Sequence, residues 1–169
     1  NRIVNEFDEK TGVVGPALLY PNRMIQSAGF FINKYGLNMH YGRNRLYDGI
    51  NKTTISVPMV TGCGLTTRMD LLKQNNGFPV YYPYGWDDLD WCLYVKKYGY
   101  NIKVCRSSYF YHLGTVSYSG RDNKRYHHNR KMVYKKYQDV INDLNSDEKN
   151  SYYDDNKKIV LILCDEDSI

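Results

Sequence analysis

The chain has 169 residues, of which 42% are hydrophobic and 15% aromatic. This apolar content is enough for one buried core and excludes a chain that is disordered throughout. The net charge of +5 is too small to indicate a nucleic-acid-binding protein by itself. No apolar run is long enough to span a membrane, no signal-peptide pattern opens the sequence, and the four cysteines are widely spaced. These features predict a cytoplasmic protein with reduced thiols.

The first part of the chain predicts strands joined by turns and one long loop. Residues 13–20 are an apolar run interrupted by Gly15 and Pro16, which predicts a short buried strand broken by a turn. Strand character resumes at residues 25–32. Residues 33–54 show no periodicity and predict a long surface excursion. Residues 57–61 are expected to return to the sheet before a tight backbone passage at residues 62–64.

Helices and strands alternate in the second part. Residues 68–74 predict a short helix, and residues 87–98 predict a second one, with acids in its first turn, lysines in its last and Gly99 behind it. Strands at residues 100–105 and 108–112, a loop at 114–123 and one long helix at 124–144 complete the pattern. The alternation predicts an α/β layered domain with a mixed sheet.

The ends of the sequence indicate a piece of a longer protein. The chain begins without an initiator methionine and stops at Ile169, shortly after the apolar run at residues 159–163. We predict one domain at residues 1–145, a polar linker at 146–156, and the first strand of a following domain at 157–169.

Three carboxylates stand at the start of the second predicted helix: Asp87, Asp88 and Asp90. Free amide groups and the helix dipole favour ionised carboxylates there, and capping alone explains one or two of them. Asp88 shares a helical stripe with Cys92, so we expect it at the packed, open end of the helix, where a general base can be partly desolvated. Asp90 shares a stripe with Lys97, which predicts a solvated position. On spacing alone, capping is the stronger interpretation.

A series of short motifs follows one order along residues 11–130. They are Val14-Gly15-Pro16, Ile25-Gln26-Ser27-Ala28-Gly29, Thr61-Gly62-Cys63-Gly64-Leu65, Arg68 with Asn76-Gly77-Phe78, Asp87-Asp88-Leu89-Asp90-Trp91-Cys92, Lys97-Tyr98-Gly99-Tyr100, and Tyr111-His112 with Ser117. In order and spacing they resemble the second half of family 2 glycosyltransferases, in the rhamnosyltransferase-like branch. This resemblance implies the C-terminal, acceptor-side part of a GT-A fold, the fold of nucleotide-diphospho-sugar transferases.

The resemblance implies an inverting transfer, as in polysaccharide biosynthesis. The partners would be a nucleotide-diphosphate sugar as donor and a hydroxyl of a glycan or another acceptor, and the protein would be peripheral to a membrane. Asp88 matches the aspartate of the family's acidic pair and would be the catalytic base. Asp87 stands beside it where a glutamate is usual, and Asp90 is predicted to contact substrate.

Four further residues receive roles from the resemblance. Gly62 and Cys63 match the place where the backbone passes close to donor sugar and acceptor, and glycine there leaves room for the sugar. Trp86 would stack on a sugar ring, although a tryptophan at a helix start is as often a packing anchor. His112 matches a histidine that completes metal coordination or contacts the donor diphosphate, with a structural histidine at a strand end as the alternative.

The implied metal is Mg²⁺ or Mn²⁺, held in the family by an aspartate-x-aspartate motif in a preceding nucleotide-binding half. Asp88-Leu89-Asp90 and Asp165-Glu166-Asp167 match the three-letter pattern but do not lie on the nucleotide-binding side. We therefore predict that the main metal motif is absent here and that this chain alone is inactive.

Two other functions compete with glycosyl transfer. One is a module that binds a glycan or a partner without catalysis. The other is a nucleic-acid-binding domain that uses the basic, tyrosine-rich residues 121–137. Because no nucleic-acid-binding motif accompanies these charges, we predict no nucleic-acid partner and interpret them as a solvated helix face.

Overall fold

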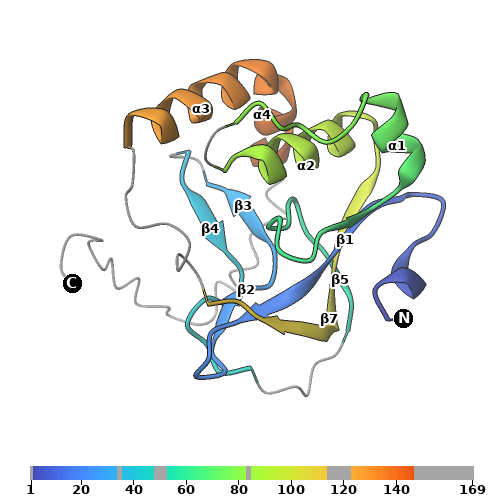
Figure 1. The fold of residues 1–169 in the computed structure, drawn as a ribbon, viewed down its shortest axis with the longest axis vertical. Helices are drawn as coiled ribbons and strands as arrows, with labels where there is room; N and C mark the ends of the chain where they lie inside the picture. Colours follow the sequence, from blue (N-terminus) through green and yellow to red (C-terminus); the bar gives the residue numbers. More distant parts are fainter. Residues whose placement is uncertain (1, 34–35, 48–52, 83–84, 114–122, 147–169) are drawn as a thin grey trace.

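The computed structural model describes residues 2–33, 36–47, 53–82, 85–113 and 123–146 (Figure 1). It is a mixed α/β structure in which the helices α1 to α4 lie along one side of a sheet. The predicted α/β class with a mixed sheet is confirmed at this level. The predicted linker and following domain, apart from residue 146, lie outside the described residues. Within the described part of the chain, no helix is long and apolar enough to cross a membrane.

Strand β1 (Thr11–Leu19) is the centre of the sheet, and all nine of its residues are buried. It pairs in parallel with β7 (Asn101–Tyr111), which pairs in turn with the antiparallel β5 (Ile55–Ser56). The antiparallel strands β2 (Ile25–Ser27) and β6 (Thr66–Thr67) also pair with β1, at its end and its beginning. Because β1 has neighbours of both directions, the sheet is mixed.

Strands β1 and β7 are each continuous, where the sequence predicts an interrupted strand and two separate strands. The register shifts between Pro16, which pairs with Cys105, and Ala17, which pairs with Tyr109. The extra residues of β7 form a bulge opposite Pro16, which has no N–H to donate to a ladder. The prediction of breaks was therefore wrong because the bulge absorbs the irregularity without ending either strand.

A second, two-stranded sheet joins β3 (Phe30–Ile32) to the antiparallel β4 (Asn38–His40). Gly29, with φ of 88°, separates β2 from β3 where one strand was expected, and a Cβ there would lie 2.8 Å from Val57. Strand β4 lies inside the predicted surface excursion. Of the predicted return strand at residues 57–61, the structure shows an isolated bridge between Met59 and Phe30.

The helices are a 3-10 turn η1 (Val4–Glu6) and four α-helices, namely α1 (Met69–Gln74), α2 (Asp87–Lys97), α3 (Asn123–Lys136) and α4 (Gln138–Ser146). The predictions of α1 and α2 are confirmed. The single helix predicted at residues 124–144 is wrong, because the chain bends at Tyr137 between α3 and α4. Side chains of α2, including the fully buried Trp91, Leu93 and Val95, form the core together with those of the sheet.

Candidate functional site

The candidate site begins where α2 begins. Trp86, the residue before the helix, has the left-handed φ of 75°, so the chain turns sharply into Asp87. The Trp86 carbonyl accepts the first helical hydrogen bond, from the Asp90 N–H at 2.8 Å. The helix start lacks a side-chain cap from Trp86, and the free amides of its first turn face the carboxylates. The first turn of α2 therefore holds three carboxylates, those of Asp87, Asp88 and Asp90.

Asp88 joins the helix start to the loop at residues 62–65. Its Oδ2 accepts the Gly62 N–H at 2.8 Å, and its Oδ1 accepts the N–H of the next residue, Leu89, at 2.8 Å. The side chain is half-buried. This contact joins the Gly62 turn to the start of α2 across 26 positions of the sequence.

Burial raises the pKa of Asp88 to about 6, and the negative charge of Asp87 adds to the rise. The N–H groups of Gly62 and Leu89 act in the opposite direction by stabilising the carboxylate. A carboxyl group with this pKa is ionised at neutral pH and still binds a proton readily, which is the property of a general base. The role of catalytic base that the resemblance assigns to Asp88 stays a prediction.

The two glycines of the loop have different surroundings. A Cβ on Gly62 would meet the Asp88 side chain at 3.5 Å, an ordinary contact, so packing alone does not require glycine there. Gly64 has φ of 75°, and a Cβ on it would lie 2.7 Å from the ring of Phe110. Between them, Cys63 is half-buried, and burial raises the pKa of its thiol.

Phe110 is a residue of this site that the sequence analysis missed. Its ring lies against Gly64 in the same loop whose Gly62 N–H binds Asp88, yet the residue is 44% exposed. An exposed aromatic ring on the loop that contacts a carboxylate suits a ligand with one apolar face and several hydroxyls. The alternation of side chains along β7 could have placed it on a face, but not beside Gly64.

His112 follows β7 directly and is half-buried. Its Nδ1 lies 2.6 Å from the Gln26 Oε1 of β2, and its backbone N–H donates to the Leu19 carbonyl at 2.9 Å. Because an amide oxygen only accepts, Nδ1 carries the hydrogen in this arrangement and Nε2 is the nitrogen left for another partner. Within the described residues His112 and Asp88 share no hydrogen bond.

The predicted Mg²⁺ or Mn²⁺ was tested against the donor atoms of the described residues. These residues contain no group of three or more His, Cys, Asp and Glu side chains that could hold a metal ion. His112 offers a single nitrogen. The described residues thus do not form a complete metal site.

The prediction that Asp90 is solvated is wrong. Asp90 has 0% exposure, and its carboxylate accepts hydrogen bonds from the hydroxyls of Tyr81 (3.1 Å), Tyr82 (2.6 Å) and Tyr137 (2.9 Å). Lys136 of α3 adds an ion pair at 2.9 Å. We call these five residues the Asp90 cluster. The pattern of one helix does not show that α3 will cover this face, so the substrate contact predicted for Asp90 is replaced by a structural role that holds α3 to α2.

Trp86 is also internal, with 5% exposure. Its ring packs beside Tyr126 and Tyr134 of α3, with centroid distances of 5.1 Å and 6.2 Å. Among the described residues, its buried Nε1 has no hydrogen-bond partner. The sugar-stacking role is therefore not supported, and the alternative interpretation as a packing anchor fits the structure, because the ring is covered by α3.

Comparisons with known proteins give no family for this chain. No protein-family model matches it, and no curated protein sequence does. The resemblance to family 2 glycosyltransferases stays a prediction, and the site rests on its own contacts.

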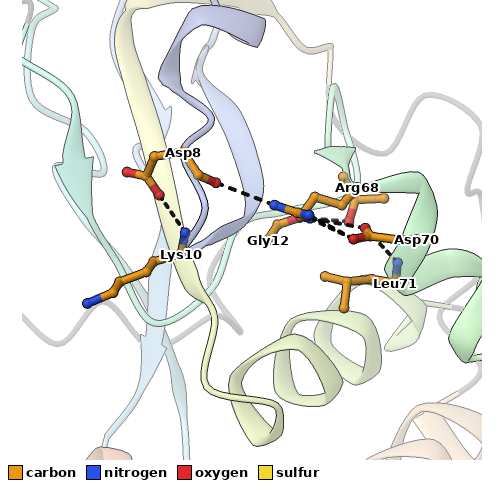
Figure 2. A network of polar contacts seen from close by, with 7 residues as sticks. Asp8, Lys10, Gly12, Arg68, Asp70 and Leu71 are labelled. Atoms are coloured by element: carbon orange, nitrogen blue, oxygen red, sulfur yellow. Dashed lines mark hydrogen bonds and ion pairs between the residues drawn. The ribbon is translucent and has the colours of Figure 1, made fainter.

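The start of α1 provides a reference for these acids (Figure 2). The Oδ1 of Asp70 accepts the N–H of the next residue, Leu71, at 2.9 Å, as Asp88 does with Leu89. Figure 2 also shows Arg68 between Asp70 and Asp8: its Nη2 donates to Asp70 at 2.7 Å and its Nη1 to the Asp8 carbonyl at 3.5 Å. The hydrogen bonds and charge of Arg68 lower the pKa of Asp70. Asp70 is thus an exposed helix-start aspartate paired with a cation.

Proposed function

We propose that this chain forms the acceptor-side half of an inverting GT-A glycosyltransferase site in which Asp88 is the catalytic base. The observation that carries the proposal is the contact between Asp88 and Gly62, which places a half-buried carboxylate with a pKa of about 6 against the loop at residues 62–65. The ion pairs of the described residues include Asp8, Asp70 and Asp90 but not Asp88. A base that is desolvated and free of a cation retains its affinity for a proton.

In the proposed step Asp88 accepts the proton of an acceptor hydroxyl through one carboxylate oxygen. The hydroxyl oxygen forms a bond to the anomeric carbon of the donor sugar as the bond from that carbon to the diphosphate oxygen breaks. The bonding electrons leave with the nucleoside diphosphate, and attack from the opposite face inverts the anomeric centre. Asp87 adds negative charge that raises the pKa of Asp88.

The loop and β7 supply the surface on which a sugar would lie. Gly62 is exposed, so its backbone can be approached closely, and Cys63 follows it. The open ring of Phe110 provides an apolar face that can pack against the C–H face of a sugar. The nucleoside diphosphate and its Mg²⁺ or Mn²⁺ would be held mainly by a preceding half of the enzyme. In this proposal the Nε2 of His112 would coordinate that metal or contact the donor diphosphate. The enzyme would act in the cytoplasm.

The test is Asp88→Asn in the full-length polypeptide, assayed by release of nucleoside diphosphate from a panel of nucleotide sugars with Mn²⁺ and glycan acceptors. Asparagine keeps an acceptor for Gly62 but does not take up the proton, so turnover should fall on the order of a hundredfold or more. Wild-type turnover should rise with pH through about 6, as Asp88 ionises. Asp70→Asn is the matched control, because it makes the same local contact at an exposed helix start.

Near-wild-type turnover in Asp88→Asn would remove the proposed role of Asp88. If no nucleotide sugar is consumed but glycans bind equally well to wild type and Asp88→Asn, the chain is a glycan-binding module. Asp90→Asn is unsuitable as a control, since Asp90 is buried and its replacement perturbs the packing of α3.

A further inference from the structure

Helix α3 presents a continuous positive stripe to solvent. Successive spacings of four, three and four residues place its members on one side of the helix. All are exposed: Lys124, His128, Lys131 and Lys135. The opposite side of α3 is buried against the rest of the molecule through Asn129 and Val133. We call the exposed set the lysine stripe.

The lysine stripe is not neutralised within its helix. The 14 residues of α3 contain six lysines and arginines, two histidines and no acid. Among the cations outside the stripe, Arg130 donates to the Gly36 carbonyl at 2.6 Å, and Lys136 pairs with Asp90. The ion pairs among the described residues do not involve a lysine of the stripe. Like charges four residues apart destabilise a helix, so the stability of α3 does not account for the stripe.

We infer that the lysine stripe binds the surface of a bilayer that carries anionic lipid headgroups. From Lys124 to Lys135 the stripe is about 17 Å long at 1.5 Å per residue, and α3 lies at the outer edge of the molecule in Figure 1. A row of flexible lysines on a straight helix matches a flat surface of negative charge. Met132 (42% exposed) lies on the flank of the stripe, where an apolar side chain can enter the headgroup region.

A flat surface fits better than a nucleic-acid duplex. The lysine stripe ends with α3, because the adjoining α4 exposes Asp139 and Asp143. A duplex brings phosphates toward both sides of an inserted helix, whereas a bilayer contacts one stripe. Arg130, whose guanidinium could pair with two oxygens of one phosphate, is already bound to the Gly36 carbonyl and lies over the Tyr134 ring.

This inference does not depend on the proposed function, but it orients the candidate site. Helix α3 packs on the start of α2 through Tyr126 and Trp86, and it is tied to that helix by Lys136 and Asp90. A bilayer against the lysine stripe would therefore lie on the far side of α3 from the buried start of α2. The catalytic assay of Asp88 and the binding assay below can fail independently of each other.

The experiment is co-sedimentation of the full chain with vesicles of phosphatidylcholine alone or mixed equally with phosphatidylglycerol. The variant Lys124→Gln, Lys131→Gln and Lys135→Gln removes three charges from the lysine stripe. The control, Lys10→Gln, Lys73→Gln and Lys97→Gln, removes three exposed charges elsewhere. Wild type should bind the anionic vesicles, and salt should weaken the binding. The stripe variant should lose affinity on the order of a hundredfold, and the control variant less than about tenfold.

The inference would be overturned if wild type did not bind the anionic vesicles. It would also be overturned if both triple variants lost the same affinity for the vesicles, because net charge alone would then explain the binding. A 20-base-pair DNA duplex serves as competitor. If it displaces the chain from vesicles and binds more tightly than they do, the partner is a nucleic acid and the inference is wrong. Circular dichroism of both triple variants checks that α3 is still folded.

Discussion

Helices α1 and α2 begin with the same local contact and give their aspartates opposite properties. Asp70 and Asp88 each accept the N–H of the following residue, at 2.9 Å and 2.8 Å. Asp70 is exposed and paired with Arg68, which lowers its pKa, whereas burial raises the pKa of Asp88 to about 6. The difference shows that the helix start alone does not set the acidity of a carboxyl group. Neighbouring elements decide it, through a cation in one case and loss of water in the other.

Asp90 extends this comparison to full burial and carries the largest expected effect on stability. Asp90→Ala leaves the hydroxyls of Tyr82 and Tyr137 buried without their acceptor and breaks the ion pair with Lys136. We expect the free energy of unfolding to fall by about 3 kcal/mol or more, measured by urea denaturation. Asp70→Ala, at the exposed helix start, is the control. A loss below about 1 kcal/mol would show that the Asp90 cluster does not hold α3 to α2.

The second prediction concerns the cost of keeping Asp88 ionised. Because burial raises the pKa of Asp88 above its ordinary value of 3.8, the folded chain binds this proton more tightly than the unfolded chain. That stabilisation is complete below pH 3.8 and is lost as the pH rises through about 6. Asp88→Asn is neutral at every pH, so wild type should lose about 1–3 kcal/mol of stability relative to it between pH 3.8 and neutral pH. Because asparagine has one oxygen for the two N–H donors of Gly62 and Leu89, the variant also carries a cost that is the same at every pH.

The stability of Asp88→Asn relative to wild type should therefore fall as the pH is lowered through about 6. Urea denaturation of both proteins across this pH range measures the difference. An equal stability difference at all pH values would mean that the carboxyl group is not desolvated. Together with the turnover of the same variant, this experiment would show whether Asp88 is retained at the expense of stability.

The smallest expected effect is on Asp70. Arg68→Gln removes the cation but leaves the contact to Leu71, so the Asp70 pKa should rise toward its ordinary value while that of Asp88 does not change. Carboxyl ¹³C NMR titration of the two aspartates follows both groups in one sample. A matching shift at Asp88 would show that the two helix starts are electrostatically coupled.

The sequence predicts helices well where both ends carry local signals. The limits of α2 were predicted closely from its first-turn acids, its last-turn lysines and Gly99. In the same way, the Asn75-Asn76-Gly77 segment marks the end of α1. The bend at Tyr137 has no such signal. It falls beside Lys136, and both residues bond to Asp90, which lies 47 positions before Tyr137 in the chain. A helical periodicity at residues 124–144 therefore predicted one helix where tertiary contacts produce two.

The same reasoning explains which site residues were predicted. Asp88 and Gly62 were each singled out from motifs, and the structure brings them into contact. Asp90 and Trp86 were misplaced because the covering helix α3 begins 33 positions after Asp90, so the helical stripe gave no sign of it. Phe110 was missed because its neighbour Gly64 is 46 positions away in the sequence. Local patterns locate chemical groups, and long-range packing decides which of them reach solvent.

The pairing of β1 with β7 also governs the order in which the chain can assemble. Thr11 pairs with Asn101, so the central ladder joins segments 90 positions apart. Closing so long a loop has a large entropic cost before any ladder bond repays it, which slows folding. During synthesis on the ribosome, the apolar β1 has no parallel partner until β7 has been made. Until then the edge of β1 can pair with other chains. Refolding at low chain concentration, or with a chaperone that covers residues 11–19, should therefore increase the recovery of native protein.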